Sequence, residues 1–154
     1  AVVNLAGRHP FEQRWTPEYV ELMRSSRVDT TRRIVGALAG SSAEDRFLVS
    51  GSGYPVYGDA GDDTLTEEAP VARGKVIDAV DAEWEDAAAP ARDYGARLVV
   101  LRTGLTFGND GGAFPVLRQP FDAGAGVAEG KEEPAAVALQ PVDGQAPGVP
   151  AIFS

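Results

Sequence analysis

Three short apolar runs, separated by two long segments with helical spacing, constrain this chain more than any other feature. The apolar runs cover residues 1–5, 46–50 and 97–102, and these lengths are typical of buried strands. The helical segments cover residues 17–39 and 75–94, and the glycine-rich segments 51–63 and 103–112 are expected to be loops. An alternation of strand and helix predicts a parallel sheet with right-handed crossovers. We therefore expect an α/β fold, namely a partial Rossmann-like parallel sheet of about three strands with flanking helices.

The first helical segment has a clear start and a clear inward face. Thr16 can accept a hydrogen bond from a free backbone N–H, Pro17 suits the first helical position, and Glu18 is attracted by the positive helix end. In the second segment, Pro90 is expected to kink the helix or end it early. The inward face of the first helix is predicted to carry Val20, Met23, Arg27, Thr31, Ile34, Val35 and Leu38.

The last part of the chain has a different composition. Of the 31 residues from Gly124 to Ser154, 16 are Gly, Ala or Pro, and the prolines prevent a long helix. We predict a Rossmann-like core over residues 1–123 and an irregular tail over residues 124–154, with one short strand near 137–139. An open sheet edge is exposed backbone, so we also expect the tail, a partner chain or a second copy in a homo-oligomer to cover it.

Charge and cysteine content exclude several classes of partner and site. The formal net charge of −9 argues against nucleic acid and anionic membranes, which bind clustered Lys and Arg. The absence of cysteine excludes disulfides, thiolate nucleophiles and cysteine-based metal sites. No apolar run approaches the ~20 residues that span a bilayer. We expect a cytoplasmic protein with no metal site, and the acidic run 59–68 is expected to be a solvated loop.

Six short motifs occur in the order and spacing of one family. Over roughly residues 1–126 the chain resembles an atypical extended short-chain dehydrogenase/reductase of the epimerase-like family, in the NAD-dependent epimerase/dehydratase superfamily. The motifs are Asn4-Leu5-Ala6-Gly7; Arg14-Trp15-Thr16 with Ser26-Arg27 and Thr31-Arg32; Ser50-Gly51-Ser52 with Tyr57-Gly58-Asp59; Leu65-Thr66-Glu67-Glu68 with Pro70; Trp84-Glu85 with Ala87-Ala88; and Arg102-Thr103-Gly104 with Gly108-Asn109-Asp110-Gly111-Gly112-Ala113.

The resemblance implies a nicotinamide cofactor, either NADP or NAD. It places Leu5, Ala6, Gly7 and Arg8 near the adenosine side of the cofactor, and Ser50, Gly104 and Leu105 near the nicotinamide. The family's glycine-rich turn, which holds the pyrophosphate through backbone N–H groups, does not occur in this sequence. We therefore expect this chain alone to bind a dinucleotide weakly. The residues that distinguish NAD from NADP are not in this sequence either.

The resemblance also restricts the catalytic candidates. Most short-chain dehydrogenases use a Tyr and a Lys one helical turn apart, but alignment through Trp84-Glu85 places Val76 and Val80 at those positions. Ser52 and Tyr57 remain as candidates, Ser52 to orient a substrate and Tyr57 to donate a proton. Each also has a structural alternative, because Ser often caps its own loop and Tyr often packs half-buried.

Two functions follow from these observations. The first is that of an NAD(P)-dependent oxidoreductase or a nucleotide-sugar-epimerase-like protein with an unknown small-molecule substrate. The alternative is a non-catalytic relic of that fold, which binds a cofactor or a partner. The missing phosphate-binding turn and the missing Tyr and Lys favour the alternative, and a chain that is only part of a longer enzyme would explain the same absences.

Overall fold

The structure is a computed structural model, and it describes residues 1–10, 12–42, 45–108 and 111–122. The chain divides after Thr103 into two compact units, which are described separately below. The predicted tail over residues 124–154, with its short strand, lies outside the described residues. The predicted boundary at residue 123 therefore stays a prediction.

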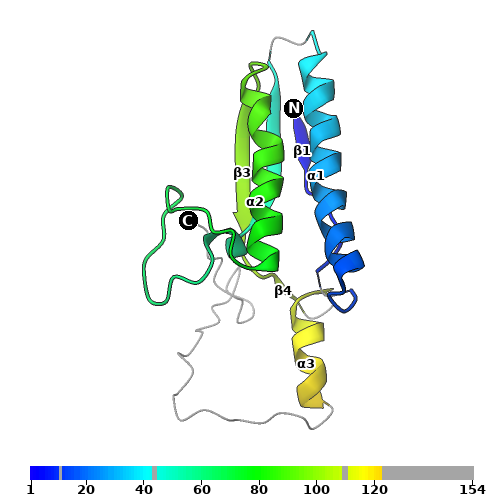
Figure 1. Cartoon of the computed structure of the whole chain (residues 1–154), viewed down its shortest axis with the longest axis vertical. Coiled ribbons are helices and arrows are strands. Elements are labelled where there is room, and N and C mark those ends of the chain that lie inside the picture. The colour runs from blue at the N-terminus through cyan, green and yellow to red at the C-terminus, as the bar shows by residue number, and fades with distance from the viewer. Residues whose placement is uncertain (11, 43–44, 109–110, 123–154) are drawn as a thin grey trace, which may run out of the picture. The chain divides into compact units, whose positions relative to one another are not determined.

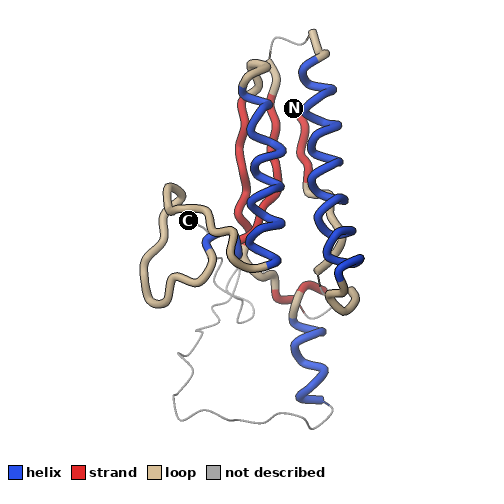
Figure 2. The backbone as a smooth tube through the Cα atoms, viewed as in Figure 1, coloured by secondary structure: helices blue, strands red, loops and turns tan. Residues whose placement is uncertain are grey.

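The first unit contains a three-stranded parallel sheet, as predicted. Its strands are β1 (Val2–Asn4), β2 (Phe47–Gly53) and β3 (Arg97–Thr103), in the order β1-β2-β3. Both neighbouring pairs run parallel, with Asn4 opposite Ser50 and Ser52 opposite Arg102. Figure 2 shows the three strands side by side behind the two long helices. Parallel pairing with a helix in each connection confirms the partial Rossmann-like fold.

Two helices cover one face of this sheet (Figure 1). Helix α1 spans Pro17–Ala39, with the predicted bounds, and the Thr16 side chain accepts a hydrogen bond from the Tyr19 backbone N–H at 3.2 Å. Helix α2 spans Val76–Ala88, which is shorter than predicted, and continues as a 3-10 turn, η2 (Ala89–Arg92). Pro90 explains the difference, because proline has no N–H to donate within an α-helix.

The prediction that β2 ends at residue 50 and is followed by a loop was wrong. Pairing with β3 continues to Gly53, opposite Thr103, and a 3-10 turn, η1 (Tyr54–Tyr57), follows. The glycines of this segment, which indicated a loop, instead allow a close approach to α2. A Cβ atom at Gly51 would lie 2.6 Å from Cη2 of Trp84. Ser52 therefore belongs to a strand rather than to a loop.

The core lies between the sheet and the two helices. Leu48 of β2 is fully buried and packs with Val35 and Leu38 of α1 and with Ala91 and Ala96 near η2. At the other end of α1, Met23 and Val28 are fully buried as well. Burial of a side chain of this size contributes about 1.5–3 kcal/mol, so this layer supplies most of the stability of the first unit.

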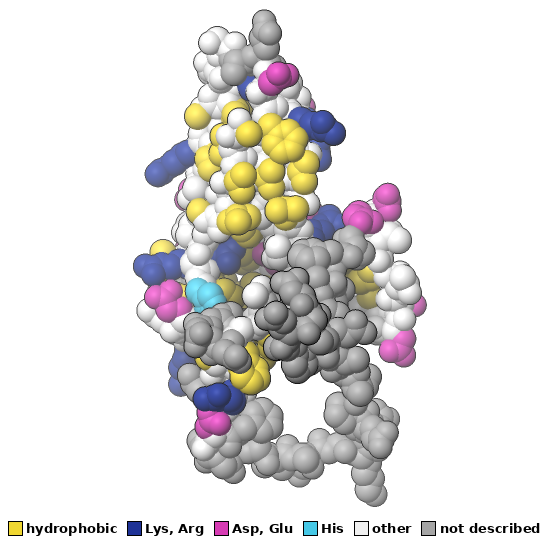
Figure 3. Space-filling view, turned by 180° about the vertical axis from the view of Figure 1, so that it is seen from behind, with side chains coloured by type: hydrophobic (Ala, Val, Ile, Leu, Met, Phe, Trp, Pro, Cys, Tyr) yellow, Lys and Arg dark blue, Asp and Glu magenta, His cyan; other side chains and the backbone are white. Residues whose placement is uncertain are grey.

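The opposite face of the sheet is open in the described part of the chain. Val3 of β1 is 64% exposed and Leu5, just after the strand, is 62% exposed, so β1 is half-buried and not buried as we expected. Val99 and Leu101 of β3, at alternate positions of the strand, are exposed as well. Figure 3, which views the molecule from behind the sheet, shows hydrophobic side chains gathered over this face. Parallel sheets are normally covered on both faces.

The second unit begins at Gly104. Its described part contains a short antiparallel pair, β4 (Phe107–Gly108) with β5 (Gly111–Gly112), followed by helix α3 (Phe114–Asp122). The segment 103–112 was expected to be a glycine-rich loop, and α3 was not predicted. No helix in the described parts of either unit is long and apolar enough to cross a membrane.

Two glycine substitutions test the packing of α2 against β2. Gly51→Ala should destabilise the fold by about 1–3 kcal/mol, because its methyl group would overlap the buried Trp84 ring. Gly36→Ala should instead stabilise it by about 0.5–1 kcal/mol, because Gly36 lies inside α1 and its added Cβ meets no heavy atom within 4 Å. Urea unfolding followed by circular dichroism measures both. Equal changes in the free energy of unfolding for the two variants would contradict the close contact between Gly51 and Trp84.

Candidate functional site

Two polar side chains of the first unit lie near the carboxyl ends of neighbouring strands, Ser52 in β2 and Arg102 in β3. In parallel α/β sheets, ligands bind beyond these ends. Here two groups of polar residues lie between the sheet and the helices. We name them the Ser52 cluster, which consists of Ser52, Glu85 and Arg102, and the Arg27 cluster, which consists of Arg27, Asp81 and Trp84.

The Ser52 cluster is a closed set of hydrogen bonds. The Ser52 hydroxyl donates to Oε1 of Glu85 at 2.6 Å. Arg102 donates to both carboxylate oxygens of Glu85, from Nε at 2.8 Å and from Nη2 at 2.9 Å. Burial opposes the ionisation of Glu85, but the hydrogen bonds from Arg102 and Ser52 outweigh it and lower the pKa of the carboxyl group. Glu85 is therefore a stable carboxylate that holds Ser52 in one orientation.

A cavity adjoins this cluster. Its volume is about 340 Å³, and its lining includes Tyr57, Glu85, Arg92 and Arg102. The Arg102 guanidinium lies 4.8 Å from the centre of the Tyr57 ring and also donates to the Glu67 carbonyl at 2.9 Å. The cation fixes the aromatic ring at the wall of the cavity.

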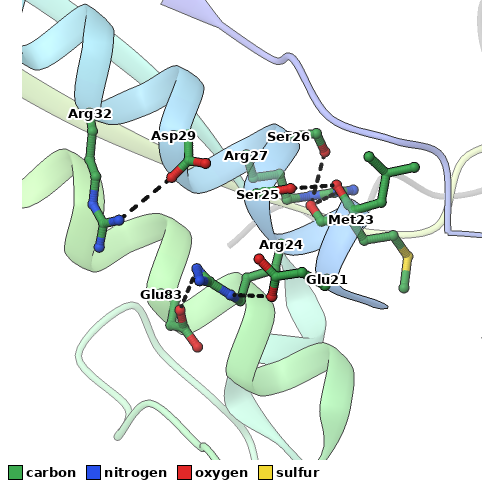
Figure 4. A network of polar contacts seen from close by, with 10 residues as sticks. Glu21, Met23, Arg24, Ser25, Ser26, Arg27, Asp29, Arg32 and Glu83 are labelled. Carbon is green, nitrogen blue, oxygen red and sulfur yellow. Dashed lines mark hydrogen bonds and ion pairs between the residues drawn. The ribbon is translucent and has the colours of Figure 1, made fainter. Parts of the chain in front are cut away.

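The Arg27 cluster joins helices α1 and α2. Arg27, only 9% exposed, donates from Nη1 to the Met23 carbonyl at 3.0 Å (Figure 4). Its guanidinium lies 5.2 Å from the centre of the Trp84 ring. Its Nε is buried and has no hydrogen-bond partner among the described residues. On the exposed side of α1, Arg24 pairs with Glu83 of α2 at 3.3 Å, as Figure 4 also shows.

Asp81 lies on the α2 side of this cluster. It is 5% exposed, and a Cβ atom at Gly53 would lie 2.7 Å from its Oδ2. Burial raises the pKa of Asp81 from its ordinary value of 3.8 to about 6; Arg27 opposes the shift, whereas Glu85 and Asp78 add to it. A carboxyl group with this pKa exchanges protons near neutral pH.

The predicted adenosine-side residues form one turn after β1. Leu5 is exposed, and the Ala6 N–H donates to Oδ1 of Asn4 at 3.3 Å. A Cβ atom at Gly7 would lie 2.9 Å from Cγ of Arg27. The Arg8 N–H donates to the Ser26 hydroxyl at 3.0 Å. The turn is thus packed against α1, and its predicted role in cofactor binding stays a prediction.

The other predicted residues occupy different surroundings. Ser50 is fully buried in β2 between the sheet and the helices. Gly104 and Leu105 belong to the second unit, so their proximity to a nicotinamide stays a prediction. Ser52 is 4% exposed and engaged with Glu85, while Tyr57 lines the cavity. Their catalytic roles also stay predictions.

Three charged residues of the site were not recognised as candidates from the sequence. Arg27 was assigned to the inward face of α1, but its unpaired Nε was not foreseen. Asp81 and Glu85 lie on α2 beside Trp84, which is buried. A charged residue at an inward-facing position of a helix could have indicated these three residues. An unpaired charge is costly to bury, so a charge at such a position points to a functional site.

Comparisons with known proteins place this geometry in context. No model of a known protein family matches the sequence. The chain is 32% identical over 126 residues to the epimerase family protein Mb2239 of Mycobacterium bovis, an alignment that covers 82% of this chain and 41% of that protein. The chain therefore spans about two fifths of the length of this curated relative.

Solved structures of epimerases and epimerase family proteins are also similar to this chain over part of their length. The nucleoside-diphosphate sugar epimerase of Corynebacterium glutamicum is 34% identical, with a TM-score of 0.63 over 78% of this chain and 25% of that one. The human epimerase family protein SDR39U1 (isoform 2), solved with NADPH, is 26% identical, with a TM-score of 0.66 over 80% of this chain and 42% of that one.

The raised pKa of Asp81 predicts a pH dependence of stability. The folded state holds the Asp81 proton more tightly than the unfolded state, so the stability gained from this group is full below about pH 4 and is lost as the pH rises through about 6. Relative to Asp81→Asn, the wild type should therefore lose about 1–3 kcal/mol between pH 4 and pH 7. Urea unfolding across this range measures the loss. Asp86→Asn, at an exposed position of α2, is the control; a pH-independent difference for Asp81→Asn would contradict the assignment.

The Ser52 cluster predicts a second difference in stability. Glu85→Gln leaves the guanidinium of Arg102 without its counter-charge, and both side chains are largely buried, at 14% and 17% exposed. We expect a loss of about 1–3 kcal/mol. The matched variant Glu83→Gln removes the exposed partner of Arg24 and should cost no more than about 1 kcal/mol. Unfolding midpoints of the two variants make the comparison, and equal losses would show that the cluster contributes no more than a surface pair.

Proposed function

We propose that this chain, a homologue of the epimerase family proteins over about two fifths of their length, takes part in NAD(P)-dependent epimerase or oxidoreductase chemistry on a small-molecule substrate. The proposal covers NADP and NAD alike. A cytoplasmic location and a homo-oligomeric state stay predictions.

The observation that carries the proposal is the similarity to the human protein solved with NADPH. That similarity extends over 80% of this chain. It therefore covers far more of the chain than the turn after β1 and the end of β2. The arrangement of polar groups at the carboxyl ends of parallel strands supports it, because ligands of open α/β sheets bind there.

The residues of the turn after β1 suit the adenosine side of a dinucleotide. Leu5 offers an exposed apolar surface for a base, and Arg8 offers an exposed cation for a phosphate. Gly7 lets the Arg27 side chain pack closely against this turn, since a Cβ atom at Gly7 would lie 2.9 Å from Cγ of Arg27. Ser50, Gly104 and Leu105 are proposed for the nicotinamide side. The bound cofactor would supply hydride transfer.

Ser52 and Tyr57 have distinct proposed roles. The Ser52 hydroxyl donates its proton to Glu85, so its oxygen is left to accept a hydrogen bond from a substrate hydroxyl. Ser52 would then orient the substrate. Tyr57, at the wall of the cavity and beside Arg102, is the proposed proton donor.

A non-catalytic, cofactor- or partner-binding role is the second candidate. Val80, at the position of the usual Lys, is 3% exposed, and Ser52 is 4% exposed. Both observations favour packing over catalysis at these two positions. Cofactor binding is common to the two candidates, so the first experiment tests binding.

Titration of the ¹⁵N-labelled chain with NADPH tests the proposal. We expect saturable amide shifts at residues 5–8, with weak affinity of order 1 mM, because charge-assisted contacts to the pyrophosphate are missing. Gly7→Ala should weaken binding at least about tenfold, by forcing the turn away from Arg27. Gly36→Ala, inside α1, is the matched control and should bind as the wild type does. The absence of saturable shifts in the turn would overturn the proposal.

A further inference from the structure

A long loop of the first unit, residues 58–72, is closed at its base. It follows η1 and precedes helix α2 (Figure 1). The N–H of Ala72 donates to the carbonyl of Val56 at 2.7 Å. Gly58 has a φ of 71°, and a Cβ atom there would lie 2.7 Å from the Cβ atom of Ala72. Because its two ends lie together, residues 58–72 form an Ω-loop with a narrow neck.

Two arginines tie this Ω-loop to the rest of the first unit. Nη1 of Arg102, in β3, donates to the carbonyl of Glu67 at 2.9 Å. Directly after the loop, Arg73 pairs with Asp86 of α2 at 2.8 Å. The side chains of that pair are 52% and 61% exposed, so it contributes little. The Arg102 side chain is only 17% exposed, so its bond to the loop is the stronger of the two ties.

Charge explains why the loop needs such a tie. The Ω-loop contains no Lys or Arg. Glu85 and Asp86, which face it from α2 at the cavity, are acidic. Like charges repel, so the loop and the helix are held together only with cations between them. Arg102 bonds to both carboxylate oxygens of Glu85 and to the loop at once. The acidic residues of the loop are Asp59, Asp62, Asp63, Glu67 and Glu68.

The loop forms one wall of the cavity beside the Ser52 cluster. Glu67 is its contribution to the lining, and Tyr57 lies directly before the loop. The helical side supplies Glu85, Asp86, Ala89 and Arg92, and β3 supplies Val100 and Arg102. Movement of the Ω-loop about its neck therefore removes a wall of the cavity and opens a path to Tyr57.

We propose that the Ω-loop is a lid on this cavity and that Arg102 latches it closed. The inference rests on the proposed function, because Tyr57 is the proposed proton donor at this cavity. While the latch holds, the loop keeps water away from Tyr57 and from a bound substrate. Opening breaks the contacts of Arg102 and Arg73 with the loop and leaves the neck intact. Substrate enters and product leaves in the open state.

Thiol labelling of the full chain measures this opening. The sequence has no cysteine, so a single introduced thiol gives an unambiguous signal. Val100→Cys places the thiol in the cavity lining, and Val35→Cys places it in the core, where it is exposed by unfolding of the whole unit. An aromatic disulfide reagent labels each thiol at increasing urea concentrations. We expect the rate at Val100→Cys to change little at low urea, because a local opening exposes little surface, and the rate at Val35→Cys to rise steeply.

Arg102→Lys tests the latch. Lysine keeps the positive charge, but its ammonium group cannot hold Glu85 and the Glu67 carbonyl together as the planar guanidinium does. We expect the variant to accelerate labelling of Val100→Cys without urea at least about tenfold, because the charge-assisted bond to the loop is lost. Any acceleration at Val35→Cys reports a general loss of stability and should be smaller. Arg24→Lys, at the exposed pair with Glu83, is the matched control and should change neither rate.

Several results would overturn the inference. They are labelling of Val100→Cys as fast as in the unfolded chain, a urea dependence as steep as that of Val35→Cys, or an unchanged rate in Arg102→Lys. If Val100→Cys does not fold, amide order parameters of the ¹⁵N-labelled chain decide. In Arg102→Lys they should fall below about 0.6 over residues 59–68 and stay near about 0.85 in α2, and an unchanged loop would contradict the latch. No cofactor is present in these measurements, so the lid can fail while the NADPH titration upholds the proposed function, and the reverse.

Discussion

The Thr31 hydroxyl is the junction on which the first unit depends. Its oxygen accepts hydrogen bonds from Nδ2 of Asn4 at 2.8 Å and from Nε1 of Trp84 at 2.9 Å, and it donates to the Arg27 carbonyl at 2.7 Å. One fully buried atom thus joins β1, α1 and α2. Because buried polar groups are costly to leave unpaired, these bonds favour the observed relative register of the three elements. That register sets the positions of Gly7, Trp84 and Asp81.

The parts of the fold that local chemistry determines were predictable from the sequence. Thr16 and Pro17 define the start of α1, and its bounds were predicted to the residue. The parallel order of the strands followed from their alternation with helices. The extension of β2 through Gly51 and Gly53 was not predictable, because glycine favours loops unless a neighbouring element requires a close approach, and here Trp84 and Asp81 require it.

The site was less predictable than the fold for a related reason. Ser52 and Tyr57 were selected by resemblance, whereas the partners of Ser52 depend on register. Ser52 and Arg102 are opposite each other in neighbouring strands, and Glu85 reaches both from α2. No spacing within the sequence connects these three positions. Asp81 could have been suspected as a carboxylate on the inward side of a helix, but its neighbour Gly53 comes from another element.

The face of the sheet that the described residues leave open has a consequence for how copies of the molecule behave in solution. Its exposed side chains, Val3 and Leu5 among them, favour contact between molecules. The formal net charge of −9 opposes that contact through repulsion between like-charged molecules. Added salt screens the repulsion over about 8 Å at physiological ionic strength but leaves the apolar attraction in place. Added salt should therefore lower the solubility of this protein. It has the opposite effect on molecules that associate through surface ion pairs, because salt weakens those pairs.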